Sequence, residues 1–82
     1  MARTYVLSSR GRHLSDGMAI DPPDSNSEAM IIWALAKVGS PLTVLDVAFE
    51  LDMDSPDEVD ELQRGINKGL QSGNILVFSE TQ

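Results

Sequence analysis

The strongest hydrophobic pattern in the chain predicts a helix that begins after Ser55 and ends at Gly73. Ser55 is followed by Pro56 and, three residues later, by Glu58, which makes a Ser-x-x-Glu capping box with proline at the first helical position. The apolar positions inside this stretch recur at helical spacing: Val59, Leu62, Ile66 and Leu70. Gly73 and Asn74 both tolerate left-handed backbone, so they supply the stop.

A shorter helix is predicted directly before this one, beginning at Thr43. Asp46 lies three residues after Thr43, at the position that glutamate occupies in the Ser-x-x-Glu box, and its carboxylate side chain is one methylene shorter. One face of this helix is apolar and consists of Val44, Val47, Ala48 and Leu51. The turn between the two helices is Asp52, Met53 and Asp54, and we expect Met53 to tuck beneath the helix pair.

A third helix is predicted from Ser25 to Val38, with Ser25 and Glu28 as its capping box and Gly39 as its stop. Its apolar positions fall on two faces, Ala29, Ile32, Trp33 and Ala36 on one and Ile31, Leu35 and Val38 on the other. A helix that is apolar all round is either central to the core or has a second apolar partner. The second alternative assigns the face with Ile31, Leu35 and Val38 to an interface with another protein or another copy of the chain.

Two short strands are predicted, Thr4–Ser8 and Ile75–Phe78, and the polar stretch Ser9–Asp16 between the first strand and the helices reads as a loop. Because little chain follows the second strand, we expect it to pair with the first, which would cover an open edge. The first quarter of the chain could equally be a disordered arm. The predicted organisation is therefore an N-terminal arm over residues 1–24, containing at most one strand, and a domain over residues 25–82.

The stretch PLTVLDVAFELDMDSPDEVDELQRGINKGLQSGNILV, residues 41–77, resembles the helix–turn–helix core of winged-helix domains. The resemblance extends over about residues 26 to 79. It implies a small α+β domain with three helices, short strands and a truncated wing. The turn of this family often carries glycine where Asp52 stands here, and aspartate also adopts left-handed backbone. The alternative is an unrelated three-helix bundle.

The formal net charge of −7 is unevenly distributed along the 82 residues. The first twelve residues contain Arg3, Arg10 and Arg12 and no acid, whereas the segment Asp46–Glu61 contains eight acids and no base. A surface of this kind repels a phosphate backbone. Aspartate outnumbers glutamate eight to five and there are only two lysines, a bias that also occurs in proteins of high-salt cytoplasm. The excess of acidic residues therefore has two explanations. Either it reflects the kind of partner that the protein binds, or it reflects a cytoplasm with a high salt concentration.

The resemblance to winged helices makes the solvent face of the last predicted helix a candidate nucleic-acid surface. Side chains of the types that contact phosphates and bases recur there at helical spacing: Arg64, Asn67, Lys68 and Gln71. The N-terminal arm offers three further cations for the backbone or a minor groove: Arg3, Arg10 and Arg12. The first turn of the same helix is acidic, which opposes this hypothesis, and the alternative is a solvated face with a basic tail.

Other chemistry has weak support in the sequence. The only histidine is His13, there is no cysteine, and no nucleophile–base set can be argued. The acids Asp52, Asp54 and Asp57 are spaced like part of a calcium loop, but the sixth-position glycine is missing. Gly65 and Gly69 lie inside a helix, where they indicate either close packing or a flat docking surface. We expect no enzyme activity, no cofactor, no metal and no small-molecule substrate.

The chain contains no secretory signal and no apolar run long enough to span a bilayer, so a cytoplasmic protein is expected. The function predicted from these features is a non-catalytic winged-helix-type interaction module, a protein-binding adaptor or regulator in transcription or replication. Its partner would be another protein or a second copy of the chain. The alternative is a sequence-specific DNA-binding transcriptional regulator that uses the last helix and the basic arm, which the net charge disfavours.

Overall fold

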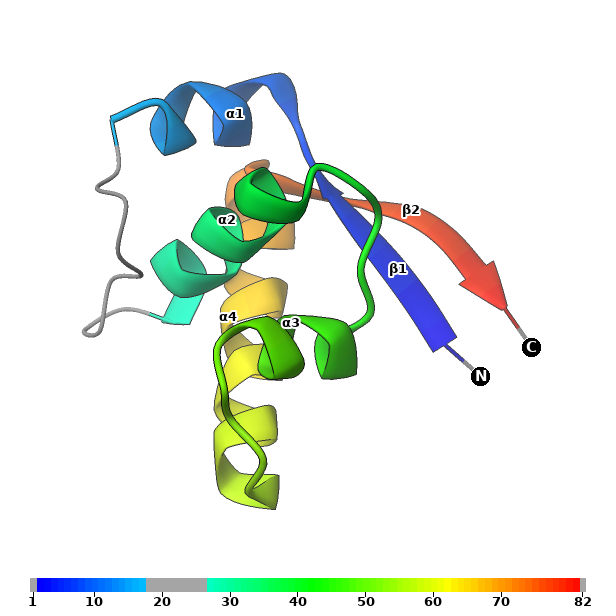
Figure 1. Ribbon diagram of the computed structural model, residues 1–82. Helices are drawn as coiled ribbons and strands as arrows, with labels where there is room; N and C mark the ends of the chain where they lie inside the picture. The colour runs from blue at the N-terminus through cyan, green and yellow to red at the C-terminus, as the bar shows by residue number, and fades with distance from the viewer. Residues whose placement is uncertain (1, 18–26, 82) are drawn as a thin grey trace.

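The structure is a computed structural model that describes residues 2–17 and 27–81. Its elements follow one another as β1 (Ala2–Leu7), α1 (Ser9–Ser15), α2 (Ser27–Val38), α3 (Val44–Glu50), α4 (Pro56–Ser72) and β2 (Ile75–Thr81). α2 crosses the upper half of α4, α3 packs against both helices, and the two strands lie beside them (Figure 1). The predicted α+β class is confirmed, although the described residues form four helices where three were expected.

One hydrophobic core joins the helices to the strands. Its fully buried large side chains come from α2, α3, α4 and β2: Ile31, Ile32, Val47, Leu62, Ile66 and Ile75. The predicted apolar stripe of α4 forms this core, with Leu62 and Ile66 buried and Val59 and Leu70 packed against its edge. Met53 also packs against the core, and its backbone amide donates to the carbonyl of Ala48 over 2.9 Å. The predicted position of this turn methionine is confirmed.

The capping signals in the sequence act as predicted. The amide of Glu58 donates to the Ser55 hydroxyl over 3.2 Å, and the amide of Asp46 donates to the Thr43 hydroxyl over 3.1 Å. α4 ends at Gly73, whose φ of 84° lies in the left-handed region that favours glycine. The turn between α3 and α4 contains Asp52 at φ 57°, a left-handed conformation that aspartate adopts more readily than most other residues. The predicted start of α2 at Ser25, like the domain boundary at residue 24, lies outside the described residues.

The N- and C-terminal strands pair, as the sequence predicted. β1 and β2 are antiparallel, with Tyr5 opposite Val77 and Leu7 opposite Ile75. The register shifts between Thr4 and Tyr5, so Phe78 is the extra residue of a β-bulge. On its other side, β1 is bridged by Leu42, because Tyr5 and Leu42 exchange two backbone hydrogen bonds of 2.8 and 3.2 Å. The segment before α3 is thereby fixed to the sheet.

The loop predicted over Ser9–Asp16 is wrong, because this stretch forms the helix α1. The hydroxyl of Ser8 caps the helix by accepting from the amide of Gly11 over 3.1 Å. Gly11 lies so close to the backbone carbonyl of Asn74 that a β-carbon would overlap it. α1 is therefore held by contact with the turn between α4 and β2, a contact that the local sequence pattern does not contain.

Two glycines let α4 approach its neighbours closely. A β-carbon on Gly65 would lie 2.8 Å from the backbone carbon of Ser27 in α2, and one on Gly69 would overlap the side chain of Ile75. Both glycines are buried. Close packing is thus the explanation of this pair, and the alternative of a flat docking surface for a partner helix is wrong.

Candidate interaction surfaces

The four α4 residues predicted to read nucleic acid lie together on its solvent face. They are all exposed, on the side of the helix opposite the core stripe: Arg64, Asn67, Lys68 and Gln71. Two of them are engaged by neighbours on the same helix. The Arg64 guanidinium lies 3.2 Å from the Glu61 carboxylate, and the Asn67 side-chain oxygen accepts from the Gln63 amide over 3.2 Å. Asp57 and Asp60 share the exposed face, so its charge is acidic at the helix start and mixed further along.

The three cations assigned to a basic arm are distributed over β1 and α1 (Figure 1). Arg3 pairs with Glu80 of β2 at 2.8 Å, and this hydrogen bond together with the charge of Glu80 raises the pKa of Arg3. Arg10 donates to the backbone carbonyl of Ser72 over 3.2 Å, at the C-terminus of α4, where a cation complements the helix dipole. Arg12 lies two residues further along α1, about half a helical turn from Arg10, and lines a pocket. The structure therefore does not gather these arginines into one strip.

The predicted partner interface on α2 is corrected by the structure. Ile31 is 0% exposed and Leu35 is 4% exposed, because α4, α1, β1 and α3 pack around α2 within the same chain. Of the three residues of this predicted interface, only Val38, at the end of α2, reaches the surface, with 37% of its area exposed. α2 is the central core helix, which was the first of the two alternatives drawn from its apolar sequence. An interface that uses Ile31 and Leu35 would require the domain to open.

A surface that the sequence analysis did not identify lies on α3. Leu45 is 65% exposed and Phe49, one turn further along, is 77% exposed, so two large apolar side chains project from one side of the helix. Asp46 and Glu50 follow them directly in the sequence, and Glu50 forms an ion pair with Lys37 at 3.4 Å. The sequence signal was available, because these two apolar residues are four positions apart and fall outside the predicted core face of the helix.

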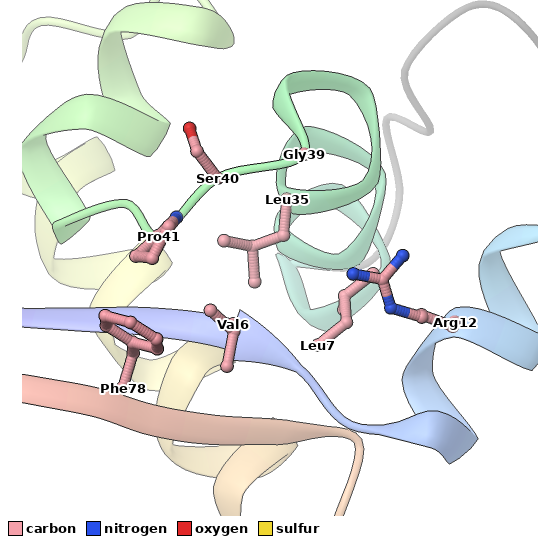
Figure 2. A pocket seen from close by; sticks show the side chains of 8 residues that line it. All are labelled: Val6, Leu7, Arg12, Leu35, Gly39, Ser40, Pro41 and Phe78. Carbon is pink, nitrogen blue, oxygen red and sulfur yellow. The ribbon is translucent and has the colours of Figure 1, made fainter.

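A second apolar feature is an open pocket between the sheet and the end of α2. Its volume is about 140 Å³. Figure 2 shows Val6 and Phe78 projecting from β1 and β2 toward Leu35 and Pro41, while Arg12 reaches the rim from α1. The Phe78 side chain is 63% exposed and forms one wall. The pocket is therefore apolar inside and has one cation at its edge.

Within residues 2–17 and 27–81, no group of three or more histidine or acidic side chains is arranged to hold a metal ion. Among the helices of these same residues, none has the length and apolar character needed to cross a membrane.

Comparisons with protein-family models, curated proteins and solved structures found no significant match to this chain.

Proposed function

We propose that the chain is a non-catalytic protein-binding module of winged-helix type, an adaptor or regulator in transcription or replication in the cytoplasm. The observation that carries this proposal is the pair Leu45 and Phe49, exposed side by side on an acidic helix. Aromatic residues, phenylalanine among them, are enriched in protein–protein interfaces relative to the rest of the surface. An exposed phenylalanine four residues from an exposed leucine presents the apolar centre of such an interface, with acids as its polar rim.

The charge distribution supports a protein partner over a nucleic acid. Non-specific affinity for DNA comes from cations that displace counterions from phosphates. Arg3 and Arg64 each pair with a glutamate of the same chain, and Lys37 pairs with Glu50 while lying over the ring of Trp33. A partner with a basic and apolar surface would complement α3 and the start of α4 instead.

The order of elements supports the winged-helix part of the proposal. After the strand β1 and the short helix α1 come the core helix α2, an extended segment that Leu42 bridges to β1, the helix–turn–helix pair α3 and α4, and the strand β2. β2 pairs with β1 rather than with a following strand among the described residues. This arrangement agrees with the truncated wing that the resemblance implies.

A photo-crosslinking experiment tests the proposal in cells. A photoreactive amino acid replaces Phe49 in one variant and Gln71, which is exposed on the solvent face of α4, in a matched control. We expect position 49 to form an adduct with a transcription or replication protein, and we expect Leu45→Ser to remove that adduct. Adducts at position 71 alone, or adducts with nucleic acid, would contradict the proposal.

A second candidate function is supported by one specific observation. Arg64, Asn67, Lys68 and Gln71 are all exposed on one side of the second helix of the helix–turn–helix pair. That is the helix which DNA-binding members of this architecture place in the major groove. The candidate is therefore a sequence-specific DNA-binding regulator, and it requires the acids at the start of α4 to lie away from the phosphates.

A further inference from the structure

The described residues carry opposite charge at two ends of the molecule. α1 contains Arg10, Arg12 and His13 and no acid within its own residues, and one acid, Asp16, caps its end. The segment Asp46–Glu61, which covers most of α3 and the start of α4, contains eight acids and no base. Figure 1 places α1 and the start of α4 at opposite ends of the molecule, with α3 toward the acidic end. The chain is therefore electrostatically polarised.

Each of these ends also carries an apolar feature. The acidic end presents Phe49, the most exposed large apolar side chain among the described residues, with Leu45 one turn before it. The basic end adjoins the pocket between β1, β2 and the end of α2, with Arg12 at its rim (Figure 2). The backbone of Arg12 is hydrogen-bonded within α1, but its guanidinium forms no hydrogen bond or ion pair with another described residue and is available to a carboxylate.

The pocket has the size and lining to accept an aromatic ring. Apolar cavities of about 150 Å³ in proteins bind benzene, and this pocket has a volume of about 140 Å³. Its walls include Val6, Leu35, Pro41 and Phe78. Although the pocket is open on one side, a phenylalanine side chain that enters it would contact aliphatic groups and the Phe78 ring, a contact that aromatic pairs favour.

We propose that the chain associates head to tail, with Phe49 of one copy seated in the pocket of the next and Arg12 paired with an acid beside that phenylalanine. The inference rests on the proposed function and names its partner as a second copy. The Phe49 surface and the pocket that accepts it lie at separate places on the same chain. A contact of this kind between copies repeats from one copy to the next and generates a ring or an open filament. A symmetric contact between two acidic ends would instead place eight acids against eight, which like-charge repulsion disfavours.

Analytical ultracentrifugation of wild type and two exposed-site variants tests the inference. Phe49→Ser removes the inserted ring, and Arg12→Glu reverses the charge at the pocket rim. We expect the wild-type mass to rise with concentration above the 8.9 kDa of one chain. We expect each variant to associate about thirtyfold more weakly or worse, the loss typical of a central interface residue.

An equimolar mixture of the two variants separates head-to-tail association from a symmetric dimer. The Arg12→Glu chain still has its phenylalanine and the Phe49→Ser chain still has its pocket, so the mixture should recover one working contact and stop at a dimer. Arg64→Glu is the matched control, because it changes the net charge equally at an exposed arginine that does not line the pocket, and it should associate as wild type does.

Three outcomes would overturn head-to-tail association. They are a wild-type chain that stays at 8.9 kDa at high concentration, variants that associate as wild type does, and a mixture that recovers nothing. Leu76→Ser detects the competing arrangement, pairing through the open edge of β2, because Leu76 is exposed on that strand and does not line the pocket. A monomeric wild type combined with a crosslink from position 49 to another protein would remove this inference and leave the proposed function standing.

Discussion

Gly65 shows how a single residue sets the distance between the two central helices. A β-carbon there would lie 2.8 Å from both the backbone carbon of Ser27 and the terminal methyl group of Ile31. Real β-carbons essentially never approach so closely, so a larger residue must push α2 away from α4. Glycine at this position therefore has two opposite effects on stability. It destabilises the helix because its helix propensity is low, and it stabilises the domain because it permits close packing.

The prediction at this scale is that Gly65→Ala destabilises the domain. Helix propensity alone would stabilise the variant by about 1 kcal/mol, whereas overpacking typically costs about 1–3 kcal/mol. We expect the packing cost to exceed the gain in propensity, lowering the free energy of unfolding in urea. Gly17→Ala is the control, because among the described residues its β-carbon would meet no atom nearer than 3.9 Å. A Gly65→Ala variant more stable than wild type would show that α2 and α4 are less closely packed than described.

Asn74 illustrates a residue whose role is only partly visible in the sequence. Its place after Gly73 predicted a helix stop, and its backbone amide does donate to the carbonyl of Gly69 over 2.9 Å. Its side-chain amide also donates to the Glu28 carboxylate over 3.0 Å, which ties the start of α2 to the turn between α4 and β2. That contact joins residues 46 positions apart, and no local spacing rule connects such a pair.

At the scale of elements, the sequence predicted the helices whose capping residues and apolar stripe lie within their own stretch of the chain. α3 and α4 carry capping boxes and an apolar stripe within their own residues, and both form where expected. α1 was missed because Ser9–Ser15 has no apolar stripe, and its only large apolar residue, Leu14, is exposed. Its stability comes from Gly11 against Asn74 and from Arg10 at the end of α4. Helices of this length depend on such tertiary contacts more than on their own propensity.

The candidate sites also differ in whether the local sequence could predict them. Exposure of the polar α4 face followed from its position opposite the core stripe, so Arg64, Asn67, Lys68 and Gln71 were placed correctly on one surface. The burial of Ile31 and Leu35 could not be decided from α2 alone, because it depends on which neighbours surround an entirely apolar helix. The pocket is built from four separate segments, so no single stretch of sequence contains it.

The capping box of α4 supports a prediction at the element scale. Ser55→Ala removes the hydroxyl that accepts from the Glu58 amide. Loss of such a cap costs about 1 kcal/mol, and we expect the urea midpoint to fall with little change in the slope of the transition. Ser40→Ala is the matched control, because Ser40 is exposed and makes no hydrogen bond among the described residues. Equal midpoints for the two variants would show that the cap contributes nothing to stability.

At the scale of the whole molecule, charge decides between the two proposed functions. The solvent face of α4 holds Arg64 and Lys68 beside Asp57, Asp60 and Glu61, and Arg64 is already paired with Glu61. Two cations next to three acids release few counterions from a phosphate backbone. Substituting Asp57, Asp60 and Glu61 by Asn, Asn and Gln removes this repulsion while leaving the Ser55–Glu58 capping box intact.

The most direct measurement is fluorescence anisotropy of a labelled pool of mixed-sequence duplex DNA, titrated at physiological salt with wild type and with this triple variant. If the chain is a protein-binding module, the wild type should show no measurable binding to DNA. Proteins that bind DNA non-specifically typically give dissociation constants of about 10⁻⁴–10⁻⁶ M in such a titration. An increase confined to the triple variant would indicate a recognition helix restrained by its own acids. Tight binding by the wild type that weakens steeply with added salt would contradict the protein-binding account and establish the DNA-binding regulator in its place.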